Sequence, residues 1–107
     1  MIVSIPLHFS WFNDEVNTEK IQCLMEEFYS GANFIKVLKK DEGISDKGYF
    51  RPDNLVGTNC LEISIFGNDE NNQLIISSRL DNLGKGASGA AIQSMNIALG
   101  FDESLGL

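Results

Sequence analysis

The chain has 107 residues, a formal net charge of −7 and 43% hydrophobic residues. This length predicts a single domain over residues 1–107, which can bury roughly two-thirds of its unfolded surface. The negative charge argues against binding to nucleic acid or to an anionic membrane surface.

The composition also limits the compartment and the metal chemistry. No stretch approaches the roughly 18–20 apolar residues of a membrane span, and residues 1–7 lack the basic segment and cleavage site of a signal peptide. Two cysteines, Cys23 and Cys60, without an export signal predict reduced thiols and a cytoplasmic location. One histidine, His8, and two distant cysteines do not make a zinc site, so no metal is expected.

Hydrophobic periodicity predicts six regular elements. In chain order they are a strand over 2–9, a helix over about 18–30, a short strand over 34–38, strands over 58–66 and 73–80, and a helix over about 88–99. Asn17 is the expected N-cap of the first helix. Gly31 and Gly100 are expected to end the two helices. Pro6 lacks an N–H and therefore predicts an edge strand or a bulge.

The predicted helices carry apolar stripes, formed by Ile21, Leu24, Met25 and Phe28 in the first and by Ala91, Ile92, Met95 and Leu99 in the second. The long irregular stretch over 39–57 is of a kind that is often functional. The element order β-α-β-β-β-α predicts an α+β fold, with both helices on one face of a mainly antiparallel four-stranded sheet. The second face must then be polar or covered by another chain or domain.

The most specific pattern is Gly84-x-Gly86-x-x-Gly89, between the last strand and the last helix. It matches the dinucleotide fingerprint, but that site also needs a second strand and an acidic residue about 20 positions on, and the chain ends at Leu107. A simpler interpretation is that the glycines allow a tight turn and close helix packing. The N–H groups at the helix start, with Lys85, could also bind an anion.

Other candidates for chemistry are isolated in the sequence. A Cys–His pair would require His8 to lie beside Cys23 or Cys60, and the pattern gives no sign of this. Cys23 lies within a helix rather than at its N-terminus, and Cys60 alternates with Glu62, so neither thiol is expected to be activated. Arg79 either faces solvent from its strand or forms an ion pair near the turn.

Several segments resemble one enzyme family. Residues 80–96, LDNLGKGASGAAIQSMN, resemble the C-terminal signature of the N-acetyl-gamma-glutamyl-phosphate reductase family. Residues 1–8 (MIVSIPLH), 57–59 (GTN) and 66–69 (FGND) resemble the short-type members of that family, and Ser94 replaces a more usual Asn. The resemblance covers essentially the whole chain.

The resemblance implies the C-terminal part of a two-domain reductase. The family uses NADPH to reduce N-acetyl-gamma-glutamyl phosphate to its semialdehyde in arginine biosynthesis. Its fold resembles that of glyceraldehyde-3-phosphate dehydrogenase-like enzymes, in which a Rossmann domain binds NADP and a second α+β domain supplies catalytic groups and the oligomer interface. The Rossmann domain and the motifs that carry the catalytic cysteine and histidine are absent from this chain, so no catalytic residue is assigned.

The resemblance assigns cofactor contacts to the glycine turn alone. Asn82 would face the nicotinamide carboxamide, and Gly84, Lys85 and Gly86 would line the cofactor end of the cleft. The implied partners are a Rossmann domain and further copies of the chain in a homo-oligomer, and the chain alone is expected to be inactive. Two alternatives stay open: an autonomous oligomerisation or interaction module, and a stand-alone anion-binding domain at Gly84–Gly89.

Overall fold

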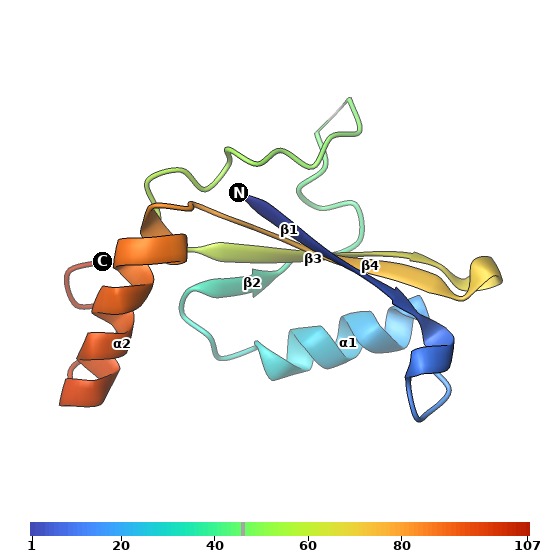
Figure 1. Cartoon of the computed structure of the whole chain (residues 1–107), viewed down its shortest axis with the longest axis horizontal. Coiled ribbons are helices and arrows are strands. Elements are labelled where there is room, and N and C mark those ends of the chain that lie inside the picture. Colours follow the sequence, from blue (N-terminus) through green and yellow to red (C-terminus); the bar gives the residue numbers. More distant parts are fainter. Residues whose placement is uncertain (46) are drawn as a thin grey trace.

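The computed structural model describes residues 1–45 and 47–107. Four strands form one sheet in the order β1-β4-β3-β2 (Figure 1). The strands are β1 (Ile2–His8), β2 (Ile35–Val37), β3 (Leu61–Asn68) and β4 (Gln73–Leu80). Because β1 and β3 both run antiparallel to β4, the prediction of a mainly antiparallel sheet is confirmed. The sheet is nevertheless mixed, since β2 pairs parallel to β3.

Pro6 lies where its missing N–H costs nothing. Met1 and Leu80 exchange backbone hydrogen bonds, so the alternate residues Ile2, Ser4 and Pro6 direct their backbone polar groups away from β4. β1 is therefore an edge strand, as the proline predicted.

Helix α1 (Thr18–Phe28) covers one face of the sheet. Asn17 caps it as predicted, accepting a 2.7 Å hydrogen bond from the backbone N–H of Lys20. Its inner side packs on the core, which is formed by Phe9, Ile21, Ile65 and Leu74. The expected stripe is only half right, because Leu24 and Phe28 are exposed, Phe28 by 79%. Gly31 does not end the helix in a left-handed conformation; Tyr29 is the C-cap.

Helix α2 (Gly89–Leu99) departs from the prediction most clearly. It projects beyond one end of the sheet instead of covering a face (Figure 1). Gly100 ends it with φ +74°, as predicted. Its expected inner residues Met95 and Leu99 are exposed, Leu99 by 62%. Apolar periodicity identified a helix and a stripe, but it carries no information about what covers the stripe.

The irregular segment between β2 and β3 lies over the face of the sheet opposite α1 (Figure 1). The Phe50 ring meets the Phe66 ring edge-on, with 5.9 Å between centroids. Beneath this segment, Ser64, Ser77 and Arg79 are buried. The second face is thus polar at its centre and covered by the chain itself. Among the described residues, no helix combines the length and the apolar character that a membrane span requires.

Candidate functional site

The glycine turn begins with an aspartate that the sequence analysis did not single out. Asp81 follows β4 directly, and its carboxylate accepts hydrogen bonds from the N–H groups of Gly57 at 2.8 Å and Leu83 at 3.0 Å. These bonds favour the charged form and hold the pKa of Asp81 below its ordinary value. A carboxylate therefore already occupies the positive end of the helical segment that follows.

Several N–H groups at the start of α2 are also paired. Residues 84–88 form a π-helical segment that runs directly into the helix. Within it, the N–H of Gly86 donates to the carbonyl of Asp81 at 2.8 Å, and that of Ser88 donates to Leu83 at 3.2 Å. The N–H of Gly89 donates to Gly84. Three of the N–H groups at this helix start are therefore already used within the chain, which leaves fewer donors for an anion than the sequence predicted.

Two of the three glycines are required by close packing. A Cβ atom on Gly84 would lie 2.5 Å from the carbonyl oxygen of Thr58, and one on Gly89 would lie 2.2 Å from Oδ1 of Asn59. Gly86 is less confined, with nearest contacts at 3.3 Å. Among the described residues no strand follows α2. The glycines thus serve the tight turn that the simpler interpretation proposed.

Lys85 turns inward from this loop. Its Nζ donates to the side-chain oxygen of Gln93 and lies 5.5 Å from the centre of the Phe34 ring. Gln93 also accepts a 3.2 Å bond from Asn59 and donates a 2.9 Å bond to Glu103. The lysine therefore ties the turn to α2 and, through Glu103, to the C-terminal tail.

Asn82 is exposed at the start of the turn. Its side chain makes no hydrogen bond within the described part of the chain, and its Oδ1 lies 3.3 Å from the place of a Cβ on Gly86. The amide and the bare backbone of Gly86 together form an open surface. Such a surface can receive the amide of a ligand through two complementary hydrogen bonds.

The other candidates are separate from this turn. The Nδ1 atom of His8 accepts a 3.2 Å bond from the backbone N–H of Ser10 and so caps a short 3-10 turn. Cys23 is exposed on α1, and Cys60 is half-buried just ahead of β3. Within residues 1–45 and 47–107, no group of three His, Cys, Asp or Glu side chains could hold a metal ion. Arg79 forms an ion pair, which was one of its two expected roles.

The sequence did not predict three residues that contact the turn, which are Asp81, Asn59 and Gln93. A signal existed for Asp81 alone, because an aspartate between a strand and a helix is a common helix cap. Asn59 and Gln93 contribute through contacts between distant parts of the chain, and no local pattern marks them.

The family model for the semialdehyde dehydrogenase dimerisation domain matches residues 1–82. The chain belongs to this family. It is also similar to N-acetyl-gamma-glutamyl-phosphate reductase 2 of Nostoc sp., with 41% identity over 109 residues that cover the whole chain and 34% of that relative. The reductases of Clostridium beijerinckii and Methanococcus maripaludis are 45% and 39% identical to 88% and 92% of the chain, in each case over 26% of the relative.

The chain thus spans about a third of the length of the curated relatives it matches, and the matched part is their C-terminal part. The dimerisation-domain match ends at residue 82, just where the glycine turn begins. The matched residues include the sheet, α1 and the covering segment, and the glycine turn and α2 follow the matched part.

Proposed function

We propose that this chain is the C-terminal part of an NADPH-dependent reductase that converts N-acetyl-gamma-glutamyl phosphate to its semialdehyde. The names of the relatives and the match over the whole chain support the substrate and the reaction. The observation that carries the proposal is the exposed Asn82, on a glycine turn where the side chains of Asp81, Lys85 and Ser88 are already hydrogen-bonded.

The chain exposes more surface than a compact domain of its mass, which supports a partner domain that covers part of it. A compact protein of 11.8 kDa is expected to expose about 5,900 Å², whereas this chain exposes 7188 Å². The radius of gyration is 15.4 Å, against about 13 Å for a compact domain of this length. We propose that a Rossmann domain, which corresponds to the rest of the relatives' length, covers the side of α2 that carries Met95 and Leu99.

The turn fits one end of a nicotinamide cofactor. Asn82 and Gly86 are exposed and can contact a carboxamide. Gly84 and Lys85 are half-buried, Gly84 against the carbonyl of Thr58 and Lys85 in a hydrogen bond to Gln93. The proposed contacts are therefore direct for Asn82 and Gly86 and indirect for Gly84 and Lys85. NADPH, when bound, would supply the hydride; the role of this chain is to orient its ring.

The nucleophile and the acid–base group are proposed to come from outside this chain. Cys23 is exposed on α1, Cys60 is half-buried ahead of β3, and His8 caps a turn through its ring nitrogen. No described residue pairs either thiol with the imidazole. We therefore expect the isolated chain to be inactive, and we place the enzyme in the cytoplasm, where both thiols stay reduced.

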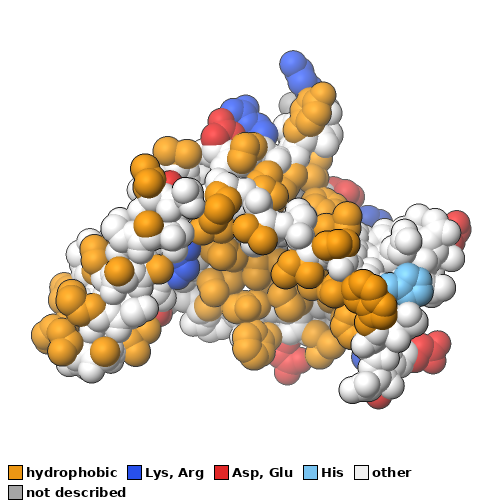
Figure 2. Space-filling model, in the orientation of Figure 1, with side chains coloured by type: hydrophobic (Ala, Val, Ile, Leu, Met, Phe, Trp, Pro, Cys, Tyr) orange, Lys and Arg blue, Asp and Glu red, His pale blue; other side chains and the backbone are white. Residues whose placement is uncertain are grey.

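A homo-oligomer is the second part of the proposal. The matched family is a dimerisation domain, and the edge strand β1 exposes apolar side chains. Figure 2, which views the molecule from the same direction as Figure 1, shows hydrophobic side chains gathered over the middle of this side. At this edge of the sheet, the exposed apolar side chains are Met1, Ile2, Val3 and Ile5. An autonomous interaction module would use the same surface.

A chimera tests the proposed function. Replacing the matched last third of the Nostoc reductase by this chain should give an enzyme that oxidises NADPH with N-acetyl-gamma-glutamyl phosphate, whereas the isolated chain should not. In the chimera, Asn82→Ala should raise the KM for NADPH or lower kcat by at least tenfold, and Asn54→Ala, at an exposed asparagine of the segment between β2 and β3, should leave both unchanged. A folded chimera without activity, or one indifferent to Asn82→Ala, would contradict the proposal.

A further inference from the structure

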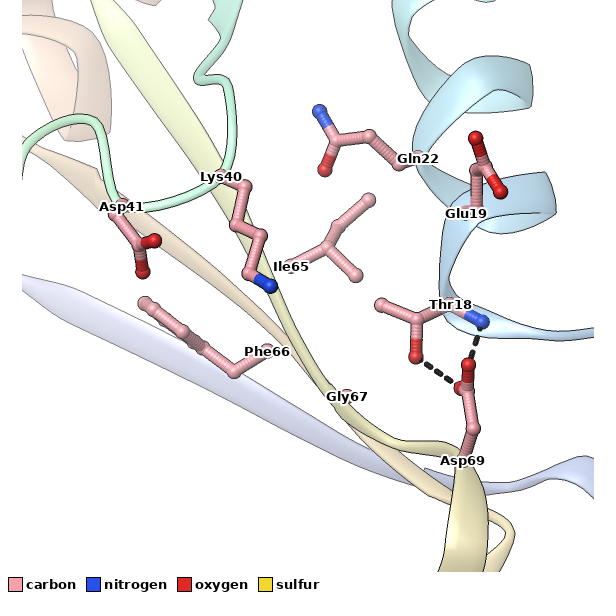
Figure 3. Close-up of a pocket in the computed structure, with 9 residues that line it drawn as sticks. All are labelled: Thr18, Glu19, Gln22, Lys40, Asp41, Ile65, Phe66, Gly67 and Asp69. Carbon is pink, nitrogen blue, oxygen red and sulfur yellow. Dashed lines mark hydrogen bonds between the residues drawn. The ribbon is translucent and has the colours of Figure 1, made fainter.

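A second candidate site lies at the other end of β3 from the glycine turn. A cavity of about 610 Å³ opens between the start of α1, residues 40–41 and the last part of β3 (Figure 3). Its volume is within the usual range for ligand sites. The comparisons and the proposed reductase chemistry leave this cavity without a role.

On the side away from β4, no described residue pairs with the backbone of β3 where it borders this cavity. β2 ends at Val37, opposite Ile63, while β3 continues to Asn68. The N–H of Leu38 donates to the carbonyl of Ile63 at 2.8 Å, which fixes the side of β3 that Ile63 presents to β2. Because strand residues alternate, Ile65 and Gly67 present their N–H and C=O groups to that same side, beyond the end of β2. Both residues line the cavity.

Two side chains add polar groups to this strand edge. The amide nitrogen of Gln22 donates to Glu26 at 2.7 Å and to the carbonyl of Leu38 at 2.9 Å, so the amide has a fixed orientation. Figure 3 shows the other atom of that amide, its oxygen, directed toward the cavity. The ammonium of Lys40 also points into the cavity and has no hydrogen bond or ion pair with any described residue.

The three acidic side chains that line the cavity differ in whether they can pair with Lys40. Asp69 accepts hydrogen bonds from both the N–H and the hydroxyl of Thr18, and it is therefore committed to the start of α1. The Glu19 carboxylate points away from Lys40 (Figure 3). Asp41 has a left-handed backbone, with φ +63°, and its carboxylate lines the side near Phe66. Lys40 is thus the cation that faces the cavity, with Asp41 as its nearest acidic neighbour along the chain.

We propose that this cavity binds the carboxyl-terminal end of an extended peptide, by strand addition to Ile65 and Gly67. Main-chain hydrogen bonds to a free strand edge, with a cation at one end for the terminal carboxylate, are a recurring means of peptide recognition. Lys40 follows β2 and enters from the Ile63 end of β3, so the peptide runs antiparallel to β3. The terminal carboxylate of the peptide pairs with Lys40, and the side-chain oxygen of Gln22 accepts a hydrogen bond from the last amide N–H of the peptide.

The test uses the whole chain and an acetylated valine–threonine tetrapeptide with a free carboxylate. Titration followed by amide NMR should shift the signals of Ile65 and Gly67 more than those of Ile2 and Ser4 on the opposite edge. Amidating the peptide's C-terminus, or Lys40→Gln, should weaken binding about tenfold. Lys39→Gln, at the adjacent exposed lysine, is the matched control and should not.

Two further measurements test strand addition and carboxylate recognition separately. Methylating the peptide amides should abolish binding, because strand addition needs those N–H groups, and Asp41→Asn should strengthen binding of the carboxylate by removing a like charge. Absence of binding at millimolar peptide would overturn the proposal. So would equal binding by the methylated peptide or by the Lys40→Gln variant, or shifts confined to β1.

Discussion

Arg79 and Glu62 face each other across β4 and β3 and form an ion pair at 2.6 Å beneath the covering segment. The side chain of Arg79 is only 3% exposed and that of Glu62 is 18% exposed. The same guanidinium donates to the carbonyls of Gly43 and Arg51, and it lies 4.5 Å from the centre of the Phe50 ring. The buried Arg79 guanidinium thus binds the irregular segment to the sheet at two residues, Gly43 and Arg51.

Removing the Arg79 guanidinium should therefore remove these two hydrogen bonds to the segment and leave the Glu62 carboxylate without its ion-pair partner. We expect Arg79→Met to lower the free energy of unfolding by about 3 to 5 kcal/mol, because a partly buried carboxylate loses its ion pair. Arg51→Met is the matched control: its ion pair with Asp53 is exposed, and such pairs contribute about 0 to 1 kcal/mol. Urea denaturation of both variants measures the difference, and equal losses would contradict a special role for Arg79.

Close packing at the start of α2 gives a second prediction. Gly89→Ala would place a methyl group 2.2 Å from the Asn59 side chain, so the turn or Asn59 must move. Overpacking of this kind costs about 1 to 3 kcal/mol. Gly31→Ala is the matched control, because nothing lies within 4 Å of the added atom and its φ is not positive. Thermal denaturation should show a lower Tm for Gly89→Ala only; an unchanged Tm would mean that the turn yields easily.

The Asp81 carboxylate predicts a particular pH dependence. Its pKa is lower in the folded chain than its ordinary value of 3.8, chiefly through the hydrogen bond from Gly57 and then that from Leu83. The stabilisation is therefore complete above the ordinary pKa and is lost as the pH falls through the lower, folded value. Asp81→Asn should be less stable than the wild type at pH 7, and the gap should close as the solution becomes more acidic.

Denaturation midpoints measured from pH 7 down to about pH 2 would test this. Asp14→Asn removes one exposed carboxylate from the loop before α1 and is the matched control. A gap between Asp81→Asn and wild type that is constant across this range would show that the charge of Asp81 is not what stabilises the turn.

Periodicity and turn chemistry predicted most of the scaffold. Alternation placed Leu61, Ile63 and Ile65 on one side of β3, and the proline at position 6 marked the edge strand. Asn17 and Gly100 marked a helix start and a helix end through local chemistry alone. Each of these features depends on residues close in sequence, which is why a pattern could reveal it.

The remaining features depend on contacts across the chain. The parallel β2–β3 pairing and the projection of α2 follow from packing that no local pattern encodes. At the candidate site, the glycines marked the turn, but the inward direction of Lys85 depends on Gln93 and Phe34. The peptide-binding cavity depends on β2 ending at Val37 while β3 continues, which is a relation between two strands.

The residues that the family model matches predict where on the chain the oligomer interface lies. The dimerisation-domain match covers residues 1–82 and excludes α2, so self-association should use the sheet side, where Ile5 is 52% exposed. We expect Ile5→Lys to raise the dissociation constant at least tenfold, because it places a charge in an apolar contact. Leu99→Lys, at a similarly exposed leucine of α2, is the comparison and should leave association unchanged. Sedimentation velocity over a concentration series distinguishes the two, and the reverse result would place the interface on α2.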